Sequence, residues 1–120
     1  MVNYSVTIDI LPTREREWVT YMLQHIKEVL DTGHFVDFTF KKVKPLVDGY
    51  ERYLIEYFSE SMLEYDRFEA NGASKLRADH DTRFAGAFKY GQSITEYTDV
   101  LNAVFYGGDG RSLFKHELAL

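Results

Sequence analysis

The amino-acid sequence predicts an α+β domain in which four strands and two helices follow one another in the order βαββαβ. Residues 2–10 alternate apolar and polar side chains, a pattern typical of a strand that buries one face. Residues 18–30 repeat apolar side chains at the spacing of a helix. The sequence S-x-x-E at residues 61–64 is a capping box, which marks the start of a second helix.

The first helix follows the first strand directly. Pro12 and Thr13 are suited to open it, and Gly33 is suited to end it because glycine readily adopts the left-handed conformation. Its apolar stripe consists of Trp18, Val19, Met22, Leu23, Ile26, Val29 and Leu30. Residues 35–43 and 50–58 are rich in aromatic and β-branched side chains, and we predict that they form the second and third strands.

The second helix is predicted to run without a break from Ser61 to about Thr82, with Gly72 allowing a close approach to the sheet. Residues 84–97 are predicted to form the fourth strand, and Gly91 indicates a bulge or bend within it. This order of elements is that of the ferredoxin-like split βαβ unit. Right-handed crossovers then place both helices on one face of a four-stranded antiparallel sheet, with the first and third strands at its centre.

The chain of 120 residues is long enough for one domain with its own core. We expect the ferredoxin-like domain to span residues 1–97. Residues 98–120 are expected to form a C-terminal extension. Because this extension is rich in apolar side chains, we expect it to pack on the domain or on the partner subunit of a dimer.

Composition and charge exclude several classes of protein. Cysteine is absent, which excludes disulfides and thiolate metal sites and fits a reducing compartment such as the cytoplasm. No apolar run approaches the length of about 18 residues that spans a membrane, and the N-terminus lacks the pattern of a signal peptide. A net charge of −5, with one small basic cluster, argues against nucleic-acid binding.

The third predicted strand is apolar on both faces. Tyr53, Ile55 and Tyr57 share one face, while Leu54 and Phe58 lie on the other. Since helices cover only one side of the sheet, one of these sets must look away from them, and an exposed apolar patch of this kind usually marks an interface or a ligand groove. We therefore expect a homodimer that associates through the open face of the sheet.

Five parts of the chain together resemble a family of short bacterial proteins known only as a domain of unknown function. They are YSVTIDI at the start, Trp18, HIKEVLDTGHF, YLIEYFSESMLEY and LRADHDTRF. Members of that family look like relatives of the dimeric α+β barrel superfamily, which pairs two ferredoxin-like sheets and holds a cavity between sheet and helices. The superfamily includes cofactor-free monooxygenases, lactone isomerases and haem-degrading enzymes. The resemblance therefore implies a fold and a dimer but no particular reaction.

Two histidines are the candidate catalytic residues. His25 lies at the edge of the apolar stripe of the first helix, and His80 lies at the edge of the stripe of the second. Because both helices cover the same face, the two imidazoles are expected to approach each other. A neighbouring carboxylate, Asp79 or Asp81, would then fix the tautomer of His80.

A pocket for a small aromatic or carboxylate-bearing ligand would complete this site. We expect Trp18 and a sheet tyrosine, Tyr57, to form its walls and Arg83 to anchor an anion. His80 would serve as base or acid, with His25 as its partner or as a ligand contact. No metal and no cofactor are required, because the histidines lack the local spacing of a metal site.

The sequence leaves other interpretations open. Both histidines could be hydrogen-bonded structural residues, and Arg83 could pair with Asp79 one turn earlier. His25, His80 and a carboxylate could instead form a two-histidine, one-carboxylate metal site. The rival hypothesis for the whole chain is a non-catalytic dimeric module that regulates or scaffolds a protein partner. Whether the protein is an enzyme stays open at this point.

Overall fold

The computed structural model of the chain describes residues 1–99. In chain order the elements are β1 (Val2–Ile10), the short 3-10 helix η1 (Pro12–Arg14), α1 (Glu15–Asp31), β2 (Asp37–Val43), β3 (Glu51–Ser59), α2 (Met62–Asn71), α3 (Ala73–Arg83) and β4 (Phe88–Glu96). The strands form one sheet in the order β2-β3-β1-β4, and each pair of neighbours is antiparallel. The predicted ferredoxin-like α+β fold is confirmed, with β1 and β3 at the centre.

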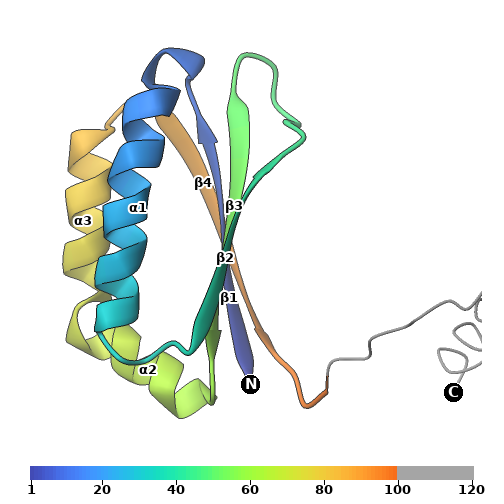
Figure 1. Ribbon diagram of the computed structural model, residues 1–120, viewed down its shortest axis with the longest axis vertical. Helices are drawn as coiled ribbons and strands as arrows, with labels where there is room; N and C mark the ends of the chain where they lie inside the picture. The colour runs from blue at the N-terminus through green and yellow to red at the C-terminus, as the bar shows by residue number, and fades with distance from the viewer. Residues whose placement is uncertain (100–120) are drawn as a thin grey trace, which may run out of the picture.

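All the helices lie on one face of the sheet and leave the other face uncovered (Figure 1). The alternation of β1 explains this arrangement, because Val2, Tyr4, Val6 and Ile8 turn toward the helices and are buried. β3 follows the same rule, with Ile55 paired opposite Val6. Leu54 and Phe58 are one residue out of step with the buried set of β3, so they lie on the uncovered face, and they are partly exposed.

The predicted second helix is broken into two. The Ser61 side chain accepts a hydrogen bond from the backbone N–H of Glu64 at 3.2 Å, so the predicted N-cap is present. The helix then ends at Asn71, Gly72 leaves the helical conformation, and α3 begins at Ala73. The expectation of one uninterrupted helix was wrong because glycine is a poor helix former that lets the backbone turn there. Ala73, directly after the break, is fully buried.

The fourth strand begins later than predicted. Residues 84–87 form a turn in which the backbone N–H of Ala87 donates to the carbonyl of Phe84 at 2.9 Å. Gly86 takes a φ of 77° in this turn, a conformation that favours glycine. β4 then pairs with β1 in unbroken register from Phe88 to Glu96, so the bulge expected at Gly91 is absent.

The stripe of α1 is narrower than predicted. Trp18, Met22, Ile26 and Val29 are buried, whereas Leu23 is 61% exposed. Gly33 ends the segment with a φ of 83°, as expected for a left-handed stop. The expectation for residues 98–120 concerns a segment that lies almost wholly outside the described residues. Within residues 1–99 no helix is long and apolar enough to cross a membrane.

Candidate functional site

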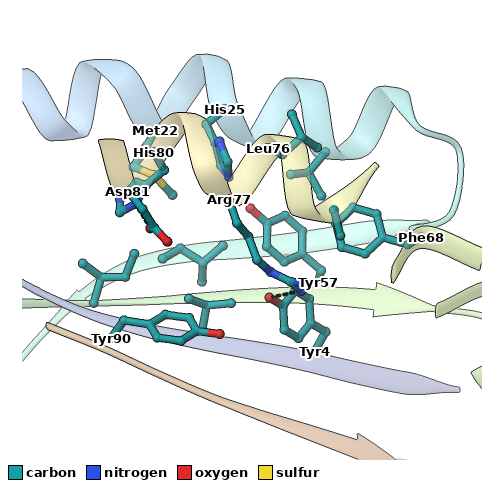
Figure 2. Close-up of a pocket in the computed structure, with 15 residues that line it drawn as sticks. Tyr4, Met22, His25, Tyr57, Phe68, Leu76, Arg77, His80, Asp81 and Tyr90 are labelled. Carbon is teal, nitrogen blue, oxygen red and sulfur yellow. Dashed lines mark hydrogen bonds and ion pairs between the residues drawn. The ribbon is translucent and has the colours of Figure 1, made fainter. Parts of the chain in front are cut away.

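A cavity of about 50 Å³ lies between the helices and the sheet (Figure 2). From the sheet, Tyr4, Val6, Ile8, Ile55, Tyr57 and Tyr90 contribute to its lining. From α1 and α3, the lining includes Met22, His25, Val29, Leu76, Arg77 and His80. A buried water needs roughly 10–15 Å³ measured in this way, so the cavity has room for a few waters or a ligand of a few non-hydrogen atoms.

His25 projects from α1 into this cavity (Figure 2). Its ring stacks on Tyr21, with the two ring centroids 5.6 Å apart. Its Nδ1 atom is buried and has no hydrogen-bond partner among the described residues. Burial, and secondarily the neighbouring His80, lowers the pKa of His25 to about 4. His25 is therefore a neutral imidazole at neutral pH.

His80 reaches the same cavity from α3, but both of its ring nitrogens are already in use. The indole Nε1–H of Trp18 donates to His80 Nε2 at 2.9 Å. Because an indole can only donate, His80 Nε2 must be the acceptor and Nδ1 must carry the proton. That Nδ1 lies 2.9 Å from Asp81 Oδ1 and donates to it. The centroids of the two histidine rings are 6.1 Å apart, so the imidazoles lie close together as predicted.

Arg77 is a lining residue that the sequence analysis missed. Its guanidinium donates to both carboxylate oxygens of Glu69, from Nη1 at 2.8 Å and from Nη2. Nη2 also donates to the hydroxyl of Tyr4 at 2.8 Å (Figure 2). These bonds hold the pKa of Glu69 below its usual range. Arg77 Nε is buried and has no partner among the described residues.

One signal in the sequence could have identified Arg77. Ala73, Leu76, Arg77 and His80 recur at intervals of three and four, so they share one face of a helix. If residues 61–82 formed one straight helix, its buried face would be set by the apolar stripe of residues 62–68. Arg77 does not lie on that stripe. The break at Gly72 gives α3 its own face toward the sheet.

The other predicted site residues lie in different surroundings. Tyr57 lines the cavity, and burial raises the pKa of its hydroxyl. Trp18 is fully buried, packs against Tyr53 and is not among the cavity-lining residues. Arg83 is also absent from the lining, because its guanidinium lies over the ring of Tyr21, 5.2 Å from the centroid.

The acidic neighbours of the site have their own partners. Asp79 accepts a hydrogen bond from the Tyr21 hydroxyl at 2.6 Å, and within residues 1–99 it makes no ion pair with Arg83.

His34, expected at the surface, is mostly buried and lies 2.9 Å from Glu64. In the described part of the chain no group of three or more histidines and carboxylates is placed to hold a metal ion.

Comparison with solved structures shows the fold. A dimeric ferredoxin-like protein from an uncultured marine organism superposes with a TM-score of 0.63 at 11% identity, over 82% of this chain and 97% of that one. SnoaB, a cofactor-independent oxygenase from Streptomyces nogalater, gives 0.59 at 12% identity, over 83% and 95% of the two chains. The de novo designed protein Foldit4 gives 0.56 at 10% identity, over 81% and 98%.

At 10–12% identity these likenesses show the fold alone, and a fold by itself implies no particular function. No curated protein matches the sequence. Residues 1–98 match the model of a family described as Domain of unknown function (DUF4286). The chain therefore belongs to the DUF4286 family, and its described part has the ferredoxin-like α+β fold.

Proposed function

We propose that this protein binds a small organic molecule in the cavity between its sheet and its helices. One observation carries the proposal. Within residues 1–99, the buried side-chain nitrogen and oxygen atoms that lack a hydrogen-bond partner are His25 Nδ1 and Arg77 Nε. Both residues line this cavity. The unpaired buried side-chain atoms of residues 1–99 therefore belong to two residues that line one cavity.

Unpaired polar atoms of this kind are costly. Leaving a buried donor or acceptor unsatisfied costs about 1–3 kcal/mol, and native proteins pair nearly all such groups. Two of them beside a largely apolar cavity resemble a ligand site, where a few polar groups orient a molecule inside an apolar wall. A bound ligand would supply the missing partners.

In this proposal His25 is the residue that contacts the ligand and exchanges a proton with it, without a cofactor. His80 positions the site, because Trp18 and Asp81 occupy both of its ring nitrogens. The acid–base role first expected of His80 would require one of these hydrogen bonds to break. Arg83 has no anchoring role in this proposal, since its side chain lies outside the cavity lining.

Native mass spectrometry of the freshly purified full chain tests this function. We expect a small organic mass that stays with the protein under gentle ionisation and leaves on activation. Ile8→Phe, which fills the cavity from the sheet side, should abolish this retained mass. Ile94→Phe is the matched control, because Ile94 lies on the same face of the sheet but outside the cavity lining. Retention that is equal in both variants would contradict the proposal.

We further propose that the protein is a homodimer joined through the uncovered face of the sheet. Leu54 and Phe58 present apolar surface there, and some of the polar side chains on that face are already paired within the chain. Glu56, for example, accepts hydrogen bonds from Asn3 and Thr39, each at 2.9 Å. One of the similar solved structures is described as a dimeric ferredoxin-like protein, which also supports the proposal.

Sedimentation velocity tests the dimer. The wild-type chain is expected to sediment as a dimer at micromolar concentration, and Phe58→Glu should shift it toward the monomer because a carboxylate would be buried without a partner. Leu63→Glu is the control, since Leu63 is 59% exposed on α2. A wild-type chain that sediments as a monomer would overturn this proposal.

A further inference from the structure

We infer that the ligand of the cavity is a small neutral molecule held by a hydroxyl or carbonyl oxygen, and that Arg77 Nε–H is the donor to that oxygen. The inference rests on the proposed ligand-binding function and names the chemical class of the ligand. An arginine beside a cavity usually indicates an anion. The contacts of Arg77 lead to the opposite conclusion.

The positive charge of Arg77 is already matched. Its two terminal nitrogens face the Glu69 carboxylate in a bidentate pair, and the two side chains are comparably buried, at 31% and 32% exposed. Arg77 and Asp81 are the lining residues that carry a formal charge, and Asp81 is acidic. A bound anion would meet a pair of net zero charge and one further carboxylate, that of Asp81, so its desolvation would not be repaid.

An ammonium group is excluded as the partner of Arg77, although the Asp81 carboxylate would attract a cation. The unpaired group of Arg77 is an N–H donor, which requires an acceptor, and an ammonium group has no acceptor to give. His25 supports a neutral ligand from the other side. Its imidazole is uncharged at neutral pH, so it can accept or donate a hydrogen bond but gives an anion no charge partner.

In this inference, one ligand oxygen is assigned to both residues. A ligand oxygen that accepts from Arg77 Nε–H can meet His25 Nδ1 in either of two ways, depending on the His25 tautomer. A hydroxyl would donate its own proton to an unprotonated Nδ1, whereas a carbonyl would accept from a protonated Nδ1. The apolar side chains around these atoms, among them Met22, Val29 and Leu76, would enclose the hydrocarbon part.

Four probes with the same number of non-hydrogen atoms test the charge of the ligand. They are 2-butanone, 2-butanol, propionate and sec-butylammonium, titrated at pH 7 against the isotope-labelled full chain and followed by NMR chemical shifts. We expect one or both neutral probes to shift the resonances of His25 and Arg77, with a dissociation constant at least tenfold lower than that of propionate or sec-butylammonium. Tighter binding of propionate would overturn the inference.

Arg77→Lys tests the named donor. Lysine keeps a positive charge beside Glu69 but removes the Nε–H group, so the variant should fold and bind the neutral probe roughly 10-fold more weakly, or worse. Arg83→Lys is the matched control on the same helix, because Arg83 stacks on Tyr21 outside the cavity lining. Equal affinity in the wild type and in Arg77→Lys would overturn the role of Arg77.

Xenon separates this inference from the proposed function. Xenon enters apolar protein cavities without any hydrogen bond. If xenon shifts the resonances of the lining residues but the neutral oxygen probes bind no better than the charged ones, the cavity accepts molecules and the ligand class is wrong. If neither xenon nor any of the four probes enters, the proposed function itself fails.

Discussion

Two regions lie between the same helices and the same sheet, and they differ in how completely their polar groups are paired. The Trp18 region, formed by Trp18, Phe40, Tyr53, His80 and Phe84, is closely packed, with Trp18 and Phe84 fully buried. Its indole N–H has an acceptor, and both nitrogens of His80 are bonded. The cavity region around Tyr4, His25 and Arg77 is hollow and keeps two nitrogens that have no partner among residues 1–99.

The hollow is therefore not a general looseness of the fold. The two regions share α1, α3 and the centre of the sheet, so the same backbone supports both close packing and a cavity. Sites that bind molecules commonly give up some stability in this way. We therefore expect substitutions in the two regions to have different and in part opposite effects on the free energy of unfolding.

The largest expected effect comes from Trp18→Ala. Removing a fully buried indole leaves a large void and should lower the free energy of unfolding by about 3–5 kcal/mol. Leu23→Ala on the same helix is the control, because a side chain that is 61% exposed should change stability by less than about 0.5 kcal/mol. Urea denaturation followed by far-UV circular dichroism measures both, since Trp18 is the only tryptophan of the chain. Equal losses in the two variants would contradict the close packing of the Trp18 region.

The next effect is the pH dependence that His25 contributes. Its pKa is about 4 in the folded chain against the ordinary value of 6.5, so the unfolded chain takes up this proton at a higher pH. Stability from this side chain is complete above pH 6.5 and is lost as the pH falls toward 4. A loss of about 2–3 kcal/mol is expected.

Urea denaturation of the wild type and of His25→Phe at pH 7 and pH 4.5 isolates this contribution. The wild type should lose more stability than the variant between the two pH values, because only the wild type carries the imidazole of His25. If both proteins lose the same amount, the His25 side chain is not a buried neutral group in the folded chain.

Replacing each histidine by phenylalanine compares the stability that the two regions draw from their polar groups. His80→Phe leaves the Trp18 N–H buried without an acceptor and should cost about 1–3 kcal/mol of stability at pH 7. His25→Phe removes an unpaired nitrogen and should leave stability unchanged or slightly higher. His80→Gln, which retains an acceptor oxygen, should recover part of the loss. If His25→Phe lost more stability than His80→Phe, the polar groups of the cavity region would be better paired than those of the Trp18 region, contrary to the structure.

The smallest effect is expected from Val6→Ile, which adds one methylene group on β1. Val6 lines the cavity, so Val6→Ile has space to fill and should be neutral or stabilising by up to about 1 kcal/mol. Val2 is fully buried outside the cavity lining, so Val2→Ile should be destabilising by about 1–3 kcal/mol through overpacking. Thermal unfolding of both variants checks the difference in sign. A loss in Val6→Ile as large as that in Val2→Ile would mean that the cavity is not free space.

The fold could be predicted from local patterns because these patterns repeat over several residues. The alternation of Val2, Tyr4, Val6 and Ile8 needs no knowledge of the rest of the chain, and neither does the capping side chain of Ser61. The break at Gly72 was missed, because a single glycine inside a helical pattern is often tolerated. Whether such a helix bends depends on what packs beneath it.

The site was predictable in its histidines but not in its arginine. His25 and His80 lie beside apolar stripes of helices on the same face of the sheet, which predicted that their rings approach each other, as they do in the structure. The engagement of His80 by Trp18 joins residues 62 positions apart, which no local pattern reveals. Arg77 was hidden for a related reason. A charged residue on a helix is ordinarily assigned to solvent, and only its partners Glu69 and Tyr4 explain its partial burial.

The bend at Gly72 has a mechanical consequence for this arginine. Glu69 and Arg77 are eight residues apart, and on a straight helix they would be separated by about 12 Å along the axis. Their bidentate contact therefore depends on the bend, and straightening the two helices into one would pull the pair apart. The contact thus connects α2 to α3 across the bend. Arg77, one partner of this contact, also lines the hollow below, so the bend and the wall of the cavity share a residue.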